Sequence, residues 1–351
     1  MKKGHTENSI TSRSEPDRIL VMGPNWLGDA VMSLPVYDVL RVRFPEAYIF
    51  AGCPEYVRPV YERSESINEL ITWKKGEGPW ARAARIREKT KGGLAVTFIL
   101  PPSFSSALTA WLVMSGQRVG YGTDMRGLLL TGSIHRRMLR ECHLTEAYVR
   151  LVDKWDRVTT KEIPIPRIGH IRKGSAASIK AGIEGKYFII APGAKYGSAK
   201  MWPGERYSSL IDKINRETGW LPVLSGSVSE KDVSSEIVSG AQVKCLDLTG
   251  KSSITEMMNI MDDAELVAGN DSGAVHVAGA LGVPVVTMFG STSPRWTAPR
   301  GANVRVLSSR TQCSPCFKKE CPLGTMECFD EITVEKVMDE VRSVISMGVE
   351  E

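Results

Sequence analysis

The sequence has no apolar run of the roughly 18 to 20 residues that a membrane-spanning helix needs. Its first residues, MKKGHTENSITSRSEPDR, also lack the apolar core of a secretory signal. We therefore expect a cytoplasmic protein. Residues 1–16 contain only two larger apolar side chains, Met1 and Ile10, so they are expected to form a flexible tail.

No basic run or stripe marks the sequence, although the formal net charge is +5. This absence argues against a nucleic-acid-binding protein. Residues 17–165 contain 21 Lys or Arg against 16 Asp or Glu, whereas residues 166–351 contain 21 against 22. The excess in the first half suits a surface that meets an acidic small molecule or an anionic membrane face, and it is equally compatible with an ordinary solvated surface.

Two common nucleotide motifs are absent. The stretch GKSS at 250–253 looks like the end of a P-loop, but position 245, where the motif requires glycine, is Cys245. A dinucleotide fingerprint would need glycine three residues after Gly122, where Met125 stands. A hydride-transfer enzyme therefore has little support.

Apolar β-rich runs instead alternate with helix-periodic stretches, which predicts parallel α/β sheets. At 351 residues the chain is long for a single core, so two doubly wound domains are expected. Segment 167–186 is expected to be a linker with a lead-in helix, and 333–345 an amphipathic helix. Strands are predicted at 18–23, 47–53, 93–101, 187–193, 221–226, 243–250, 265–271 and 284–290, with helices at 30–45, 207–217, 231–239, 254–264 and 273–281.

The loops that follow the strands of the second half are rich in glycine and hydroxyl side chains: GAKYGSAKMWP, GSVSEKD, GNDSGAVH and GSTSPRW. Ligands of open parallel sheets bind at the carboxyl ends of strands, where helix N-termini favour phosphate. Any one loop can be explained as a tight turn. Four in one domain favour a nucleotide site.

The segments NWLGDAVMS, PGAKYGSAKMWP and GNDSGAVHVAGALGVPVVTMFGSTSP, taken in this order, resemble the lipopolysaccharide heptosyltransferases, above all those that add the second heptose. The resemblance covers residues 17–347. It implies a GT-B fold, in which two Rossmann-like domains face a central cleft. Residues 17–165 would bind the acceptor, and residues 166–351, ending in a helix, would bind the nucleotide sugar.

The resemblance also implies a reaction. L-glycero-D-manno-heptose would pass from ADP-heptose, with inversion, to the heptosylated inner core of lipopolysaccharide, heptosyl-Kdo2-lipid A. The alternatives are transfer of the first heptose, or of another nucleotide sugar on the same fold. A non-catalytic nucleotide-sugar-binding module would leave Asp29 without a reason to face the cleft.

Asp29 is the expected catalytic residue. It follows Gly28 at the start of a helix, where the partial positive charge favours its ionised form, so it can accept the proton of an acceptor hydroxyl. The alternative is a helix N-cap.

On the nucleotide-sugar side, the resemblance assigns Lys200 to the diphosphate and Glu230 to the nucleoside, with Ser198 as an additional donor. Asp271, Ser272 and Gly273 are expected to form a strand-to-helix turn at the diphosphate, with His276 on the same helix face. Asp271 would repel a diphosphate, so we expect it to bind a sugar hydroxyl or to fix the loop. The alternative interpretations are that Lys200 is a solvated loop lysine, that Glu230 is a surface glutamate, and that His276 is a residue of the core.

Four of the seven cysteines, Cys313, Cys316, Cys321 and Cys328, have the spacing C-x2-C-x4-C-x6-C, which suits a structural zinc or iron ion. The alternative is a cluster of reduced thiols. No D-x-D pair stands in a matched position, so transfer is expected to need no metal cofactor. Arg118 and Arg126 are candidate acceptor-binding residues, because guanidinium groups suit carboxylates and phosphates. A lipid-linked acceptor also suggests peripheral association with the inner membrane.

Overall fold

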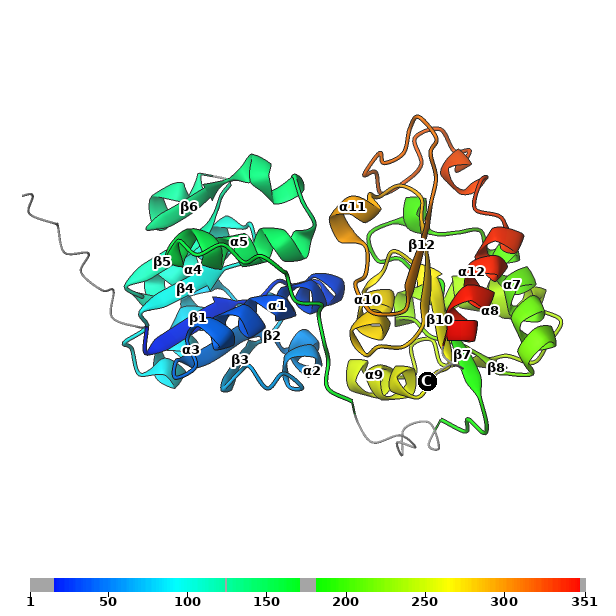
Figure 1. Ribbon diagram of the computed structural model, residues 1–351, viewed down its shortest axis with the longest axis horizontal. Coiled ribbons are helices and arrows are strands. Elements are labelled where there is room, and N and C mark those ends of the chain that lie inside the picture. The colour runs from blue at the N-terminus through cyan, green and yellow to red at the C-terminus, as the bar shows by residue number, and fades with distance from the viewer. Residues whose placement is uncertain (1–15, 124, 171–180, 348–351) are drawn as a thin grey trace, which may run out of the picture.

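The computed structural model describes residues 16–123, 125–170 and 181–347, which form two lobes, each built on a six-stranded parallel sheet (Figure 1). The strand orders are β3-β2-β1-β4-β5-β6 and β12-β11-β10-β7-β8-β9. Counted within each lobe, both follow the order 3-2-1-4-5-6 that is typical of dinucleotide-binding folds. The predicted pair of doubly wound sheets is confirmed.

The first lobe is organised around β1, whose residues Ile19 to Met22 are buried. The apolar-run criterion does not find β3, β5 and β6, because these strands mix polar residues and glycine with apolar ones. The lobe comprises β1 (Arg18–Met22), α1 (Leu27–Arg43), β2 (Tyr48–Pro54), η1 (Glu55–Val57), α2 (Arg58–Tyr61), β3 (Glu69–Trp73), α3 (Pro79–Thr90), β4 (Val96–Ile99), α4 (Phe104–Val113), β5 (Gln117–Gly122), η2 (Arg126–Leu129), β6 (Gly132–His135), η3 (Arg136–Arg140) and α5 (Leu144–Asp156).

The second lobe repeats this plan, and its three central strands β7, β10 and β11 are buried throughout. The edge strand β12 is half-exposed and was not predicted, and β9 has only two residues. The lead-in helix predicted in 167–186 falls largely on 171–180, outside the described residues. The lobe comprises β7 (Tyr187–Ala191), η4 (Ser198–Lys200), α7 (Gly204–Thr218), β8 (Leu221–Leu224), η5 (Val228–Glu230), α8 (Lys231–Gly240), β9 (Leu246–Asp247), α9 (Ile254–Asp262), β10 (Leu266–Asn270), α10 (Gly273–Ala280), β11 (Val285–Phe289), α11 (Pro294–Thr297), β12 (Val304–Ser308), η6 (Glu327–Phe329) and α12 (Val334–Met347).

The amphipathic helix predicted near the end of the sequence is α12, and it packs on α7, β11 and β12 of its own lobe. Val337, Met338, Val341 and Val344 are its buried face. Within the three described segments, none of the helices combines the length and the apolar character needed to cross a bilayer.

The lobes meet where α1 faces α10 (Figure 1). Two glycines allow the first turns of these helices to approach closely. A Cβ added to Gly28 would lie 2.9 Å from Cδ2 of His276, and one added to Gly273 would lie 2.8 Å from Cβ of Leu27. Further contacts join the lobes between α5 and the segment after α11, for example an ion pair between Arg300 and Glu146 at 2.7 Å.

Candidate active site

The predicted site residues lie at the two points where strand order reverses. In the first sheet β1 neighbours β4, and in the second β7 neighbours β10. Ligands of doubly wound sheets bind outside the carboxyl ends of the strands at such points. Asp29 lies in α1, directly after β1. Lys200 and Asp271 follow β7 and β10, so the fold brings Asp29 near two residues that lie 171 and 242 positions further along the sequence.

Asp29 is the third residue of α1 and is not its N-cap, which is Trp26. Within the described residues its carboxylate forms no hydrogen bond or ion pair. Burial raises the pKa of Asp29 from 3.8 to about 6, even though the charges of His276 and Lys200 lower it. Burial therefore outweighs the partial positive charge of the helix end, which was expected to favour the ionised form of Asp29. A carboxylate with this pKa is still largely ionised at pH 7 and suits general-base chemistry.

Unlike Asp29, Asp271 forms an ion pair and a hydrogen bond with other described residues. Its Oδ2 lies 2.5 Å from Nζ of Lys200 and accepts a hydrogen bond of 2.7 Å from Oγ1 of Thr292. Burial would raise the pKa of Asp271, but His276 and Lys200 outweigh it and the net shift is downward. Of the two roles expected for Asp271, the geometry supports fixing the loop, because Asp271 holds the ammonium group of Lys200 in place. Lys200 also lies over the ring of Tyr196, at 5.3 Å.

His276 occupies the space between the two aspartates. Its ring is 4% exposed and packs against Gly28, while Nε2 lies 3.8 Å from Oδ1 of Asp271, which is too long for a hydrogen bond. Ser272 is the N-cap residue of α10, and its Oγ is buried with no hydrogen-bond partner among the described residues. A buried hydroxyl without a partner at a helix N-terminus suits an anionic ligand.

Asn270 is a site residue whose role was not predicted. Its Oδ1 accepts hydrogen bonds from the Trp202 backbone N–H and the Tyr207 hydroxyl, each at 2.9 Å, and its Nδ2 donates to the carbonyl of Pro192 at 2.5 Å. Asn270 therefore ties the end of β10 to the segments on both sides of the Lys200 loop. Its buried position at the end of an apolar strand was the available signal.

Glu230 and Ser198 occupy the outer part of the nucleotide side. Oε2 of Glu230 accepts hydrogen bonds from the backbone and side chain of Ser227, forming the capping box of η5. The rest of the carboxylate lies against Gly193, where a Cβ would come within 1.9 Å of Oε1. Ser198 is exposed and begins η4. Nucleoside binding by Glu230 and phosphate binding by Ser198 stay predictions.

The four clustered cysteines line one cavity of about 30 Å³ and form no disulfide. Burial, together with the other three thiols, raises the pKa of Cys328 to about 11. Backbone N–H groups, that of Met326 first, lower the pKa of Cys321. Across the described segments, no three His, Cys, Asp or Glu side chains are grouped so that they could hold a metal ion. Zinc or iron binding stays a prediction, which metal analysis of the purified protein would test.

The two arginines predicted to bind the acceptor do not lie in the cleft between the lobes. Arg126 is completely buried, and its guanidinium donates to the carbonyls of Tyr121 and Pro101, at 2.6 and 2.5 Å. It holds loops together, so its assignment to the acceptor is wrong. Arg118 lies at the amino end of β5 and donates to the carbonyl of Leu129 at 2.8 Å. That end of a parallel strand is opposite the cleft, so Arg118 is also misassigned.

Comparisons with known proteins agree with this geometry. The sequence profile of Glycosyltransferase family 9 (heptosyltransferase) matches residues 91–327. Lipopolysaccharide heptosyltransferase 2 of Salmonella typhimurium is 30% identical over 350 residues, covering 94% of this chain and 99% of the relative. The solved structure of ADP-heptose lipopolysaccharide heptosyltransferase II from Escherichia coli has a TM-score of 0.82 at 27% identity, covering 94% and 99% of the two chains.

A family 9 glycosyltransferase structure from Veillonella parvula shares the fold, with a TM-score of 0.80 at 21% identity and coverage of 94% and 98%. The GT-B-like fold is thereby confirmed. The profile match, the full-length relatives and the two facing sheets show that the chain belongs to glycosyltransferase family 9, the heptosyltransferase family, and is a glycosyltransferase.

Proposed function

We propose that this enzyme transfers L-glycero-D-manno-heptose from ADP-heptose to heptosyl-Kdo2-lipid A, adding the second heptose of the lipopolysaccharide inner core. The observation that carries this proposal is the carboxylate of Asp29, which has no partner among the described residues and lies within electrostatic range of Lys200 and Asp271 across the lobe interface. Relatives named heptosyltransferase 2 support the choice of the second heptose. Residues 17–165 would bind the acceptor and residues 166–351 the donor.

Asp29 acts as the general base. It takes the proton of an acceptor hydroxyl while that oxygen attacks the anomeric carbon from the face opposite the diphosphate, so the configuration inverts. The bond from the anomeric carbon to the ADP oxygen breaks, and ADP departs with its electron pair. A diphosphate is a stable leaving anion, so no second carboxylic acid is needed.

The departing ADP gains negative charge, which positioned donors must stabilise. Lys200 supplies the cation, and Asp271 holds it in place while accepting a hydrogen bond from Thr292. The Ser272 hydroxyl and the N–H groups at the start of α10 would donate to the diphosphate. Ser198 and Glu230 would bind the outer phosphate and the ribose. No metal is assigned a role in this step.

We also propose that the enzyme works at the cytoplasmic face of the inner membrane, where its lipid-linked acceptor lies. Exposed large apolar side chains occur on α3, α4, η2 and adjoining residues of the first lobe: Trp80, Trp111, Met114, Met125 and Leu128. Aromatic side chains beside the basic residues of α3 suit an anionic membrane surface. Co-sedimentation with anionic vesicles, lost in Trp80→Ser with Trp111→Ser, would support this, and undiminished binding would contradict it.

The transfer reaction tests the main proposal. The enzyme would be incubated with ADP-heptose and either heptosyl-Kdo2-lipid A or Kdo2-lipid A, with Asp29→Asn as the inactive control. Product on the heptosylated acceptor alone is expected. Product on the bare acceptor would make this the enzyme of the first heptose. Failure with both, alongside activity with a UDP- or GDP-sugar, would overturn the proposed donor.

A further inference from the structure

A cavity of about 520 Å³ lies between the lobes, and the reaction proposed above makes no use of it. Glu55 and Tyr56 reach it from η1, directly after β2, and Lys74 and Lys75 reach it from the loop after β3. Lys195 comes from the other lobe, in the loop after β7. All five residues follow the carboxyl ends of strands, so the cavity opens on the same side of both sheets as the candidate active site.

The cavity is positively charged. Its lining contains three ammonium groups and one carboxylate, that of Glu55. Within the described segments, Lys74, Lys75 and Lys195 form no ion pair, and all three are exposed. Lysines that converge on a hollow without protein partners are suited to a ligand that carries more than one negative charge.

Two connections place this cavity beside the reacting groups. The Tyr56 hydroxyl donates a hydrogen bond to the carbonyl of Asn25, in the turn that leads to Asp29. Burial and the charge of Asp29 raise the pKa of Tyr56, which shows that the tyrosine and the base lie within electrostatic range. On the other side, Lys195 belongs to the same loop as Lys200. Tyr56 and Lys195 therefore connect the cavity to the segments that carry the base and the diphosphate lysine.

We propose that Lys74, Lys75 and Lys195 form an anion-binding subsite, shared by the two lobes, for a carboxylate or phosphate of the acceptor. The inference rests on the proposed function, which supplies an acidic oligosaccharide as acceptor. Because Lys195 belongs to the donor lobe, an acceptor bound here bridges the lobes and draws the Lys200 loop toward Asp29. The Glu55 carboxylate accepts hydrogen bonds from sugar hydroxyls at the edge of the same subsite.

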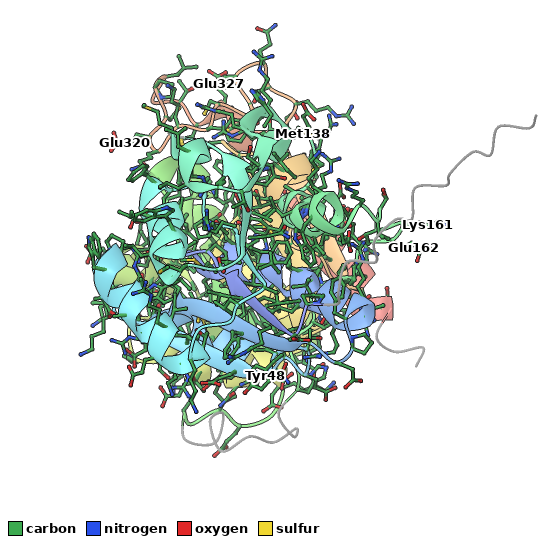
Figure 2. The ribbon with its side chains drawn as sticks, turned by 90° about the vertical axis from the view of Figure 1, so that its left-hand side faces the viewer. Tyr48, Met138, Lys161, Glu162, Glu320 and Glu327 are labelled. Carbon is green, nitrogen blue, oxygen red and sulfur yellow. The ribbon has the colours of Figure 1, made fainter. Side chains whose placement is uncertain are left out.

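Direct binding tests the subsite without depending on turnover. Calorimetry would measure the affinity of deacylated heptosyl-Kdo2-lipid A, an oligosaccharide that keeps both its phosphates and its carboxylates, for the ADP-bound enzyme and for its Lys75→Ala and Lys195→Ala variants. The matched control is Lys161→Ala, an exposed lysine that does not line the cavity and that lies at the edge of the molecule in Figure 2. Each cavity variant is expected to bind the oligosaccharide about two- to fivefold more weakly, as for loss of one exposed charge contact. ADP affinity should change less than about twofold, because neither lysine is assigned to the nucleotide.

Two modified ligands identify the group that is bound. A dephosphorylated oligosaccharide and a carboxyl-reduced one would each be titrated into wild type and Lys75→Ala. If wild type and Lys75→Ala bind one of these modified ligands with equal affinity, that ligand lacks the group that Lys75 recognises. Equal affinities of Lys75→Ala, Lys195→Ala and Lys161→Ala for the unmodified oligosaccharide would overturn the subsite, as would failure of the wild type to bind it. Normal binding without heptose transfer would instead contradict the proposed function and leave the subsite standing.

Discussion

Asp29 and Asp271 both lie where the strand order of their sheet reverses, and they have opposite electrostatic properties. Each follows a central strand, β1 or β10, and lies at the start of the helix that packs against the other lobe. The Asp29 carboxylate has no protein partner among the described residues, and burial raises its pKa to about 6. Asp271 contacts Lys200 at 2.5 Å and Thr292 at 2.7 Å, and its pKa is lowered.

Direct contact accounts for the difference. Both aspartates are within range of Lys200 and His276, but only Asp271 touches the ammonium group, so only its ionised form is compensated for the loss of water. The consequence is a division of labour between the lobes. The first lobe keeps a carboxylate free to accept a proton, and the second uses one to position a cation.

Of the substitutions that test this comparison, Asp29→Asn is expected to have the largest effect, which is on the rate of transfer. The amide is nearly isosteric but cannot accept the proton, so transfer should fall by about 10²- to 10⁴-fold. ADP affinity should stay within about twofold, because Asp29 is not assigned to the nucleotide. Steady-state kinetics and calorimetry would measure the two quantities. Asp38→Asn, on the same helix, is the matched control and should retain activity; an active Asp29→Asn enzyme would exclude this base.

Lys200→Met should have the next largest effect, because it removes the cation while keeping the length of the side chain. We expect ADP affinity to fall about tenfold or more, as for loss of a charge-assisted contact. Lys251→Met is the control, since Lys251 lies on the surface of the same lobe, where it donates to the carbonyl of Asp247. Titration of ADP into both variants would check this. Equal affinities would show that Lys200 does not bind the diphosphate.

The two aspartates should also change stability in opposite directions. The folded-state pKa of Asp29 lies above 3.8, so its stabilising contribution is present below pH 3.8 and lost as pH rises through about 6. Asp29→Asn should therefore raise Tm by a few degrees at pH 7.5, with no gain at pH 4. The pKa of Asp271 is lowered, so its contribution is present above pH 3.8 and lost at lower pH. Asp271→Asn should lower Tm at both pH values.

Scanning calorimetry at pH 7.5 and pH 4 would measure all four differences. Destabilisation by Asp29→Asn at pH 7.5 would mean that its carboxylate has a stabilising partner. An unchanged Tm for Asp271→Asn would mean that the contact with Lys200 contributes nothing to folding.

The sequence was sufficient to predict the two parallel sheets, because the alternation of apolar strands and helices is a local pattern. The residues of the candidate site were assigned with the help of the family resemblance, and their roles stay predictions. The buried strands β7, β10 and β11 are continuous apolar runs, and the loops after them are rich in small residues. The edge strand β12 escaped prediction because it is half-exposed and its sequence, VRVLS, is partly polar.

Properties that depend on distant contacts were not predicted. Arg126 is an arginine in a loop rich in glycine, and nothing local indicates that three backbone carbonyls surround it. Lys75 and Lys195 are 120 positions apart, so their common cavity exists only once the lobes are assembled. The raised pKa of Asp29 likewise comes from burial at the lobe interface and reverses the expectation drawn from its helix position.

The pH dependence of kcat/KM for heptose transfer tests the assignment of Asp29 most directly. Proton transfer needs the ionised carboxylate, so the rate should be level above neutral pH and fall tenfold per pH unit below about 6. The residual activity of Asp29→Asn should lack this acidic limb, while that of Asp38→Asn should keep it. A profile that is flat down to pH 5, with its limb near the ordinary aspartate value of 3.8, would contradict a general base with a raised pKa.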